Sequence, residues 1–563
     1  MASGACSSYM RGDGLRTNVR IYNTIPDVVK QYSLDKDRIA QIYIDWQSGE
    51  KETLLYKTIY DNAKRFACGL MKQGIRKGDI IGIGTDNIQE WMFATVGVQM
   101  CGAIPLHFVF QRIDGKDIED ILTVAGDACK AIILPPGKDD VNVSVLEQIF
   151  SFGTDKGSIS SNALPSMQFA VILSMQHTND KIFNMSDVMT KEEVELPQLD
   201  PDDAAGLFMT SGTTGSSKLV IHSHRNMLIF GHHAQIIYGL DNDKPFNDRS
   251  FCWLGGYPQW EFFTGKTRTL VKNISQVPSM AKYLEVVQQI LKDGDCNSAF
   301  MILPLLQEIL RQDYPPFNIH SLVASGQPVP SNVLSVVGKV CTRFASAYGM
   351  TEFGIGTWKE VQQQSDFADY EAGFPLPGVE IKVTDGDLCL VDRGEDGEVW
   401  VRSSLPILGY WNDPDKTNQM MTKSGWCRTG DVGKMTDQGS LIVKGRISDS
   451  MVKIGPRFVS VASIECKLKM HVGISDVVVF SYVDKKQYHC VCCAIKSKGN
   501  GLSKSDLDEY LLDKEHRTEA NFLKKLELPR SYVFLEDFPR TYSGKVNRKK
   551  VAEICKEILL KEN

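Results

Sequence analysis

In the first third of the chain, hydrophobic positions alternate between helical spacing and short continuous runs. Residues 54–75 (LLYKTIYDNAKRFACGLMKQGI) and 88–102 (IQEWMFATVGVQMCG) carry apolar side chains in a helical pattern. Residues 79–86 (DIIGIGTD) and 130–136 (KAIILPP) are short apolar runs typical of buried strands, and a pair of prolines ends the second run. Helices that alternate with buried strands predict an α/β fold with largely parallel sheets.

The pattern changes near residues 445–448, where the segment GSLIVKGRISDS ends a strand. Residues 475–483 (SDVVVFSYV) and 489–497 (HCVCCAIKS) then predict two strands, and residues 546–563 predict a helix with a basic first half. A small α+β domain is therefore expected after the larger one. We expect a disordered tail over residues 1–30, a large N-terminal domain of mixed and parallel sheets with flanking helices over 31–445, a hinge over 446–448 and a small C-terminal domain over 449–563.

The length and charge of the chain limit its partners. It has 563 residues, which is too many for one hydrophobic core, and a formal net charge of −6. The slightly acidic balance provides no global basic field to recruit nucleic acid or anionic lipid, so we expect no nucleic-acid partner. An anionic ligand must then be held by local donors. No apolar run approaches the roughly 20 residues of a membrane helix, so no transmembrane segment is expected.

The cysteines and the first residues bear on the compartment. Fourteen cysteines are scattered without a repeating spacing, which favours a reducing compartment. The first twenty residues contain three arginines, several serines and one acidic residue, but they lack the amphipathic stripe of a transit peptide. We expect an intracellular protein of the cytoplasm or the mitochondrion. Nothing in the sequence fixes its oligomeric state.

Residues 208–218 (FMTSGTTGSSK) are rich in glycine and hydroxyl side chains and end on a lysine. Backbone N–H groups of such a turn can bind an anion, and Lys218 adds a positive charge. The Walker pattern G-x-x-x-x-G-K-[ST] does not fit, because Ser217 precedes the lysine and Leu219 follows it. The turn alone is weak support for a nucleotide site.

Four further motifs follow this turn: SAYGMTEFG (346–354), GWCRTGDVG (425–433), GRISDSMVK (445–453) and PRTYSGKVNRK (539–549). In order and separation, the five motifs resemble those of the adenylate-forming superfamily. That superfamily includes acyl-CoA synthetases, beetle-luciferase-like enzymes and peptide-synthetase adenylation domains. The resemblance runs from about Leu54 to Arg548. It implies an acyl-CoA synthetase-like fold in which the small C-terminal domain is a lid.

The resemblance also implies a two-step reaction that uses ATP, Mg²⁺ and coenzyme A. A carboxylate attacks the α-phosphorus of ATP to give an acyl-adenylate and pyrophosphate, and a thiol then takes the acyl group. Because the carboxylate and the polyphosphate repel each other, the site needs cations and donors directed at the phosphates. We expect a carboxylic acid–CoA ligase for a medium-chain or similar fatty acid.

By this resemblance, two loops bind the nucleotide. The loop for the β- and γ-phosphates matches Thr210, Ser211, Gly212, Thr213, Thr214, Gly215 and Lys218. The loop beside adenine matches Ser325, Gly326, Gln327 and Pro328, although a plain strand-to-helix turn is an alternative. Ser217 stands where the family usually has proline, which loosens the phosphate loop because proline limits backbone freedom.

The remaining nucleotide contacts come from YGMTE and from two charged residues further on. Tyr348, which precedes Gly349, is expected to stack on the purine, and Thr351 to lie near the α-phosphate. Glu352 is the expected Mg²⁺ ligand, since Mg²⁺ takes one or two carboxylates plus phosphate oxygens; a carboxylate at a helix N-terminus is the alternative. Asp431 and Arg446 are expected to bind the ribose hydroxyls.

The lid residues are assigned by the same resemblance. Lys545 is expected to bridge the substrate carboxylate and the phosphate when the lid is closed, which couples chemistry to domain motion. Ser448 is the expected hinge, and rotation there would present Lys453 for the thioester step. Three positions near the pantetheine tunnel of relatives differ from the family pattern and bear on that second step: Pro456, Phe458 and Ser463.

The segment SFCWLGGYPQWEFF (250–263) lies where many relatives have an aromatic–histidine pair before the acyl pocket. Its aromatic residues, Trp253, Tyr257, Trp260 and Phe262, either line an apolar acyl channel or belong to the ordinary core. An apolar channel discriminates one methylene by only about 1–3 kcal/mol, so these residues do not define a chain length.

Three other functions are compatible with the motifs. A luciferase-like oxygenase would oxidise its own adenylate after the same first step. A peptide-synthetase-type adenylation domain is less compatible, because only eighteen residues follow Lys545. A catalytically weakened nucleotide- or acyl-binding homologue would keep the fold without the reaction.

Overall fold

The computed structural model of the chain describes residues 7–15, 23–84, 86–110, 112–137, 141–176, 180–210, 218–239, 244–272, 274, 277–292, 296–311, 319–336, 339–363, 367–385, 389–403, 408–447, 451–454, 457–460, 464–465, 468–469, 471–483, 489–499, 501–512, 529–540 and 546–562.

The largest sheet has fourteen described strands. In spatial order they are β1 (Tyr9–Arg11), β20 (Val379–Thr384), β21 (Gly397–Ser403), β23 (Cys427–Met435), β24 (Leu441–Arg446), β19 (Glu371–Pro375), β18 (Gly354–Val361), β17 (Cys341–Met350), β16 (Ile319–Ser325), β15 (Ser298–Met301), β13 (Pro245–Phe246), β14 (Arg268–Lys272), β2 (Ile39–Asp45) and β3 (Lys51–Leu55). The run from β17 to β2 is parallel, whereas the pairs from β1 to β18 are antiparallel. The carboxyl ends of the parallel strands therefore meet along one edge, where α/β sheets bind ligands.

The second sheet has eight described strands, most of them buried. In spatial order they are β10 (Phe183–Asn184), β9 (Phe169–Ile172), β6 (Cys129–Leu134), β4 (Ile80–Gly84), β5 (Ile104–Phe108), β11 (Ala204–Met209), β12 (Leu219–Ser223) and β22 (Gly409–Tyr410). The two predicted apolar strands are β4 and β6, which pair in parallel. A small separate ladder joins β7 (Ser151–Phe152) and β8 (Ile159–Ser160).

The helices of this part are α1 (Ile25–Tyr32), α2 (Tyr56–Lys72), α3 (Gln89–Met100), α4 (Lys116–Ala125), α5 (Val141–Ile149), α6 (Met185–Val188), α7 (His224–Tyr238), α8 (Gln259–Thr264), α9 (Met280–Lys292), α10 (Leu303–Arg311) and α11 (Pro414–Met420). The predicted helices over 54–75 and 88–102 are α2 and α3. Capping residues define where several helices begin: the Ser223 side chain accepts the N–H of Asn226 and starts α7, and Thr24 caps α1 in the same way.

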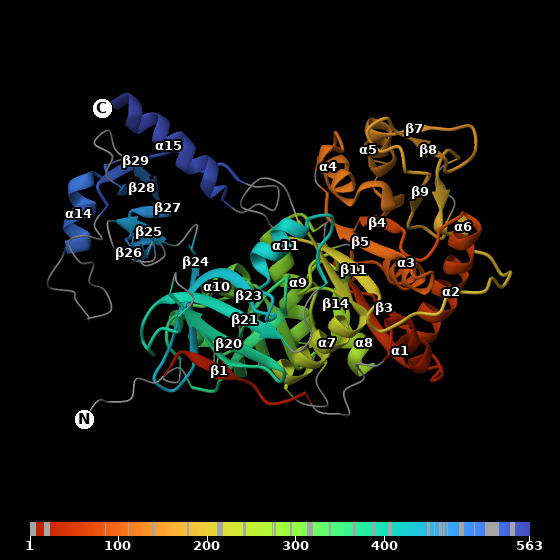
Figure 1. Cartoon of the computed structure of the whole chain (residues 1–563), viewed down its shortest axis with the longest axis horizontal. Helices are drawn as coiled ribbons and strands as arrows, with labels where there is room; N and C mark the ends of the chain where they lie inside the picture. Colours follow the sequence, from red (N-terminus) through yellow and green to blue (C-terminus); the bar gives the residue numbers. More distant parts are fainter. Residues whose placement is uncertain are drawn as a thin grey trace.

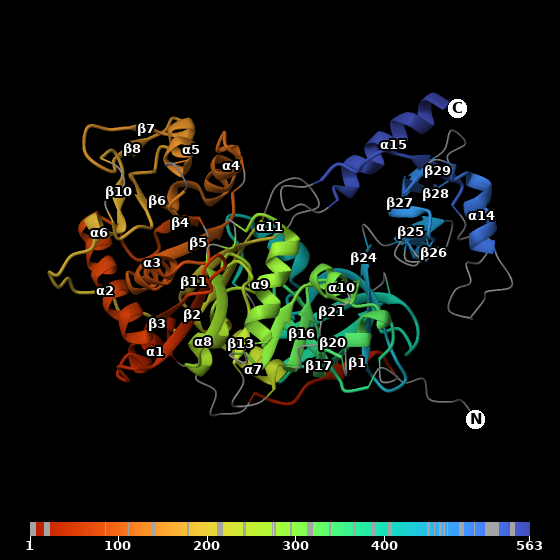
Figure 2. The same cartoon turned by 180° about the vertical axis from the view of Figure 1, so that it is seen from behind.

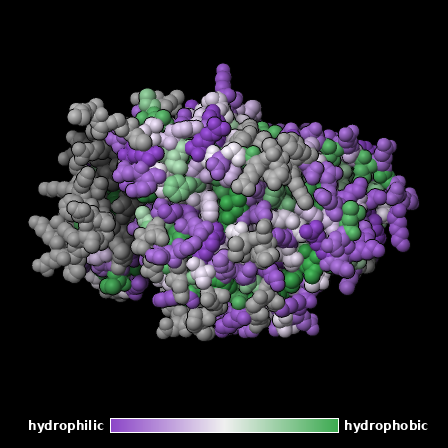
Figure 3. Space-filling view, turned by 90° about the horizontal axis from the view of Figure 1, so that it is seen from below, coloured by the Kyte–Doolittle hydropathy of each residue, from purple (hydrophilic) through white to green (hydrophobic). Residues whose placement is uncertain are grey.

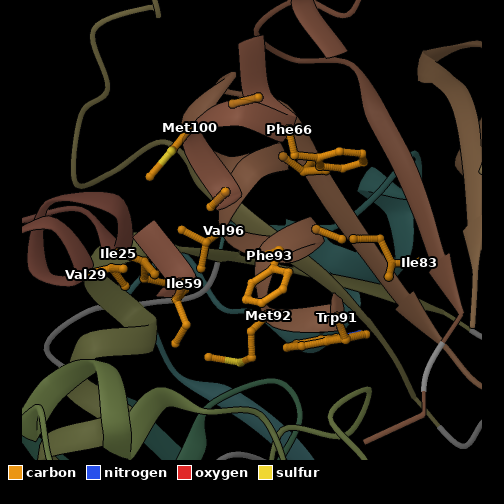
Figure 4. Close-up of a cluster of buried hydrophobic side chains, with 14 of the residues drawn as sticks. Ile25, Val29, Ile59, Phe66, Ile83, Trp91, Met92, Phe93, Val96 and Met100 are labelled. Carbon is orange, nitrogen blue, oxygen red and sulfur yellow. The ribbon is translucent and has the colours of Figure 1, made fainter. Parts of the chain in front are cut away.

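Helices α1, α2 and α3 enclose one of the main hydrophobic clusters (Figure 4). Trp91, Met92 and Phe93 of α3 are buried there beside Ile59 and Phe66 of α2. Helix α3 is apolar all round, because it lies between α2 and the second sheet rather than at the surface. This burial explains why a sequence without a polar face forms a helix here.

The expectation of a disordered tail over residues 1–30 is wrong for two segments. Strand β1 pairs antiparallel with β20 at the outer edge of the large sheet, and the Tyr9 hydroxyl donates to Glu380 at 2.6 Å. Helix α1 begins at Ile25, and Val28 and Val29 are fully buried in the cluster of Figure 4. Burial of these apolar side chains outweighs the polar composition around them.

The C-terminal elements follow β24, which ends at Arg446. They are β25 (Met451–Ile454), β26 (Arg457–Ser460), β27 (Ile474–Val483), β28 (His489–Ser497), α14 (Lys504–Leu512), β29 (Ser531–Phe534) and α15 (Arg548–Glu562). The predicted strands are β27 and β28, and the predicted last helix is α15. Figures 1 and 2 show these elements at one end of the long axis, with α1–α3 toward the other end.

The described residues on the face seen in Figure 3 are mostly hydrophilic, with scattered hydrophobic ones. In the part of the chain that the structure describes, each helix is too short or too polar to cross a membrane. The described cysteines form no disulfide with one another, and most of them are buried.

Candidate active site

Strands β11 and β12 form the hairpin that carries the predicted phosphate loop. The backbone N–H of Thr210 donates to the carbonyl of Lys218 at 2.9 Å and closes the base of the loop. Lys218 is partly exposed, and its Nζ lies 4.9 Å from the centre of the Tyr410 ring. It also lines a pocket of about 240 Å³ with Tyr410 and Trp411. Ser211, Gly212, Thr213, Thr214 and Gly215 lie outside the described residues.

The turn between β17 and β18 carries Thr351 and Glu352. Met350 pairs with Gly354 across it, so Glu352 sits in a β-hairpin turn. The alternative of a helix N-terminal carboxylate is therefore wrong. Gly354 has a φ of +71°, and a Cβ there would lie 2.3 Å from the Phe230 ring of α7. Only glycine allows the turn to pack this closely on α7.

Tyr410 connects the turn to the phosphate hairpin. Its hydroxyl donates a hydrogen bond of 2.7 Å to Oε1 of Glu352, which is only 7% exposed. Strand β22 places Tyr410 opposite Val220 of β12, two residues from Lys218. Burial, with the nearby charge of Glu352, raises the pKa of Tyr410, so its hydroxyl remains a donor at neutral pH.

His222 of β12 makes a second contact with the same turn. Its Nε2 lies 2.6 Å from the carbonyl oxygen of Thr351, so Nε2 carries the proton and donates. Burial lowers the pKa of His222 to about 4, and the ring is neutral at physiological pH. The strands of the second sheet thus hold the turn of the first sheet through both a backbone carbonyl and a carboxylate.

Asp431 and Arg446, the predicted ribose contacts, lie on the neighbouring strands β23 and β24 and form an ion pair. Asp431 is 5% exposed, and its burial raises its pKa, whereas the Arg446 charge and a hydrogen bond from Tyr348 act to lower it. Glu352 also raises the pKa of Asp431, so the two carboxylates belong to one electrostatic site. Arg446 donates in addition to the Thr429 carbonyl at 2.7 Å.

Tyr348 lies at the end of β17, and its hydroxyl donates to Asp431 Oδ2 at 2.6 Å. Tyr348 is partly exposed as a residue, as is Gly349 beside it. The adenine loop begins where the neighbouring strand β16 ends: Ser325 pairs with Ala347, and Gly326, Gln327 and Pro328 are exposed. The loop continues into a 3₁₀ helix, Ser331–Val336. The carboxyl ends of β16 and β17 thus bring the predicted adenine residues side by side.

The predicted acyl segment follows β13 at the same edge of the sheet. Tyr257, Trp260 and Phe262 are buried in hydrophobic clusters, whereas Trp253 is partly exposed. Gly255 is exposed, and a Cβ there would meet only Phe300, at 3.7 Å.

A buried arginine, Arg268, holds this segment in place. The Arg268 guanidinium donates to the carbonyls of Asn247, Gly256 and Arg249 and forms an ion pair with Glu261 at 3.2 Å. Both members of this pair are almost completely buried. Because the charge is paired and its donors are used, its burial is tolerated.

Of the predicted site residues, most of those assigned to the lid lie outside the part of the chain that the structure describes. Lys453 lies on β25, opposite Phe458 of β26, and its side chain is not described. Lys545, the hinge residue Ser448, and the departures Pro456 and Ser463 lie outside the described residues.

Glu352 fits the requirements of a Mg²⁺ ion that is bound mainly through nucleotide phosphates. Tyr410 occupies one carboxylate oxygen, and no described residue donates to the other. The described residues form no cluster of three or more acidic, histidine or cysteine ligands. Mg²⁺ commonly takes one or two carboxylates and completes its shell with phosphate oxygens and water, so one carboxylate is sufficient here.

Sequence reasoning did not select Tyr410, His222 or Arg268. Tyr410 and His222 lie in the segments LGYWN and LVIHSH, which have no composition typical of a binding site. Tyr410 lies 58 positions from its partner Glu352, and His222 lies 129 positions from its partner Thr351. Only the pairing of β12 with β22 and the fold of the β17–β18 turn bring them together.

Comparisons with known proteins identify the family of the chain. The family model "AMP-binding enzyme" matches residues 29–411. A medium-chain acyl-CoA ligase named ACSF2, mitochondrial, from Danio rerio is 24% identical over 92% of this chain and 86% of its own. The 4-coumarate–CoA ligase 1 of Solanum tuberosum is 23% identical over 88% of this chain and 87% of its own.

Solved structures share the fold. The o-succinylbenzoate coenzyme A synthetase of Bacillus subtilis, in complex with ATP and magnesium ion, has a TM-score of 0.73 and 20% identity over 93% of this chain and 99% of its own. ATP-bound MatB from Rhodopseudomonas palustris has a TM-score of 0.74 and 19% identity over 95% of this chain and 99% of its own. The predicted α/β fold of the adenylate-forming type is confirmed. The chain belongs to the AMP-binding enzyme family, as an enzyme of the adenylate-forming, acyl-CoA ligase group.

Proposed function

We propose that this enzyme activates a carboxylic acid with ATP and then transfers the acyl group to coenzyme A. The observation that supports this most directly is the arrangement at Tyr410, whose ring faces Lys218 and whose hydroxyl binds Glu352. Tyr410 thus contacts both Lys218, a cation suited to phosphate groups, and Glu352, a carboxylate suited to a phosphate-bound metal. Activation of a polyphosphate requires this combination, because negative charge must be neutralised at both the attacking and the leaving group.

In the first step, a carboxylate oxygen of the substrate bonds to the α-phosphorus as the bond to the β-phosphate oxygen breaks. Lys218 stabilises the negative charge of the departing pyrophosphate, together with the Thr210–Gly215 loop. Asp431 accepts hydrogen bonds from the ribose hydroxyls, and Arg446 supports Asp431 through their ion pair. Tyr348 lies against adenine. Glu352 would hold Mg²⁺, which would neutralise charge on the phosphates.

The second part of the proposal concerns the lid, residues 449–563, and the hinge at 446–448. Lys545 bridges the carboxylate and the α-phosphate in the closed lid and completes the charge neutralisation. Rotation about Ser448 then withdraws Lys545 and presents Lys453. In the second step the CoA sulfur bonds to the acyl carbon, AMP leaves with the bonding electrons, and the thiol proton passes to solvent or to a nearby base.

We propose a medium-chain or related fatty acid as the substrate and the cytoplasm or the mitochondrion as the location. The relative from Danio rerio is named as a mitochondrial medium-chain ligase, and the segment 250–263 is strongly apolar and aromatic. The relative from Solanum tuberosum is named for an aromatic acid. Aromatic acids are therefore the comparison class in the test.

The test is pyrophosphate release from ATP with straight-chain acids of increasing length and with aromatic acids, each with and without CoA. We expect release with medium-chain acids, and acyl-CoA only when CoA is present. Release with aromatic acids alone would overturn the substrate class. Release without any acyl-CoA would point to another acceptor, such as oxygen, and no release with any acid would favour a binding protein.

A further inference from the structure

Tyr410 contacts two groups to which the proposed function gives different tasks. Its hydroxyl binds the proposed metal ligand Glu352, and its ring faces the proposed phosphate ligand Lys218. We propose that Tyr410 is a positioning residue that couples metal binding at Glu352 to phosphate binding at Lys218. This inference rests on the proposed function and adds a residue to it.

Tyr410 is held rigidly enough to position its neighbours. It is 6% exposed, and its backbone lies in the ladder opposite Val220. Its N–H donates to the Thr417 hydroxyl of α11 at 2.9 Å. A side chain that is packed and anchored at its backbone has few alternative rotamers, so its hydroxyl and ring hold fixed directions.

The hydrogen bond to Glu352 fixes one carboxylate oxygen and leaves the other without a described donor. A carboxylate that already points in one direction loses less conformational freedom when it binds a cation. Loss of the hydroxyl is therefore expected to weaken metal binding while leaving the carboxylate in place.

The contact with Lys218 depends on a different part of the same side chain. The ammonium lies 4.9 Å from the ring centre, within the range of a cation–π interaction. Phenylalanine would preserve this contact and lose the hydroxyl, whereas leucine would lose both. The two tasks of Tyr410 can thus be separated by substitution.

The Thr351–Glu352 turn has a second tie to the same strands. His222 donates to the Thr351 carbonyl from β12, next to the point where β22 pairs. The backbone of the turn is thus held by His222 while its carboxylate is held by Tyr410. Removal of the Tyr410 hydroxyl should accordingly loosen the Glu352 side chain without displacing the turn.

The experiment measures the affinity of the full chain for α,β-methylene-ATP by titration calorimetry, with Mg²⁺ and with EDTA. For the native protein we expect Mg²⁺ to tighten binding. For Tyr410→Phe we expect unchanged affinity in EDTA and a loss of about tenfold in the tightening by Mg²⁺. Tyr410→Leu should in addition bind the analogue more weakly in EDTA, and this extra loss should disappear in a Lys218→Ala background.

The matched control is Tyr532→Phe, which removes a partly buried hydroxyl that donates to Asp508 at 2.8 Å in the C-terminal part. It should lower the melting temperature about as much as Tyr410→Phe and leave the response to Mg²⁺ unchanged. An unchanged Mg²⁺ response in Tyr410→Phe, or the absence of a response in the native protein, would overturn the coupling. If the native protein did not bind the analogue at all, the proposed function itself would fail.

Discussion

Asp431 and Arg446 stand directly opposite each other on β23 and β24, with the Arg446 Nε 3.0 Å from Asp431 Oδ1. Arg446 is the last residue of β24, so the proposed ribose carboxylate is paired with the residue at which the last strand of the large sheet along the chain ends. A nucleotide held here contacts the chain just before the proposed hinge. The proposed ribose site and the proposed hinge are therefore adjacent in the chain.

The first prediction concerns this pair. Asp431→Asn keeps the size of the side chain but removes its charge, and hydrogen bonds to a charged group contribute about 1.5–3 kcal/mol. We expect AMP to bind about tenfold or more weakly in titration calorimetry. Glu380→Gln is the matched control, because Glu380 pairs with Arg402 across β20 and β21 of the same sheet at 2.7 Å. An equal loss of AMP affinity in both variants would contradict the ribose assignment.

The second prediction separates the phosphates of the nucleotide. Lys218→Ala should weaken ATP binding by about 10- to 100-fold, because a charged donor to the outer phosphates is lost. AMP lacks those phosphates, so its affinity should remain the same. Lys218→Arg should recover part of the ATP affinity. A parallel loss for ATP and AMP would show that Lys218 acts on the fold or on the α-phosphate instead.

The third prediction separates the two half-reactions. Lys545→Ala should slow pyrophosphate release by about 100-fold or more, since one charge-stabilising donor in a closed site contributes that much. It should leave thioester formation from supplied acyl-adenylate largely intact, and Lys453→Ala should show the reverse. Lys549→Ala, an exposed lysine on α15, is the control. Loss of both half-reactions in Lys545→Ala would contradict the proposed rotation of the lid.

The fourth prediction concerns stability and pH. His107 is fully buried, neither of its ring nitrogens has a described hydrogen-bond partner, and burial lowers its pKa to about 3. Because the folded protein disfavours the protonated ring, His107 leaves stability intact above its ordinary pKa of about 6.5 and lowers it as the pH falls below that value. At pH 5 this cost is about 2 kcal/mol.

His107→Phe should therefore raise the free energy of unfolding, with a larger gain at pH 5.0 than at pH 7.5, as measured by urea unfolding. His107→Gln is the matched variant, because it cannot take up a proton in this range but keeps buried polar atoms. It should flatten the pH dependence without the gain at pH 7.5. A pH dependence unchanged in both variants would contradict the role of His107.

Much of the fold could be predicted from short-range pattern. The buried runs that became β4 and β6 and the helical patterns that became α2 and α3 lie in one continuous α/β unit, where local periodicity and tertiary burial agree. Strand β1 and the start of helix α1 were mispredicted as parts of a disordered tail, because their order comes from partners far away in the chain. Tyr9 binds Glu380, and the N–H of Ile25 donates to His224.

The candidate site also contains residues that sequence motifs identify and residues that only the tertiary structure identifies. Lys218, Glu352, Asp431 and Arg446 could be selected because each lies in a motif. Tyr410 could not, because its importance comes from the β12–β22 pairing and not from its neighbours in sequence. The placement of Glu352 in a hairpin turn was also beyond reach, since a Thr–Glu pair fits a helix start equally well. For both Tyr410 and Glu352, the decisive information is the position of the residue in the fold, which residue type does not reveal.

Strand β1 has a consequence for how the protein can be handled. It is the outermost strand of the large sheet and covers the backbone donors and acceptors of β20. A chain trimmed to begin at residue 12 would leave that edge open, and an open edge can recruit a strand from another molecule. Such a trimmed protein is expected to aggregate during expression while its nucleotide site remains intact, so poor yield would mimic a catalytic defect.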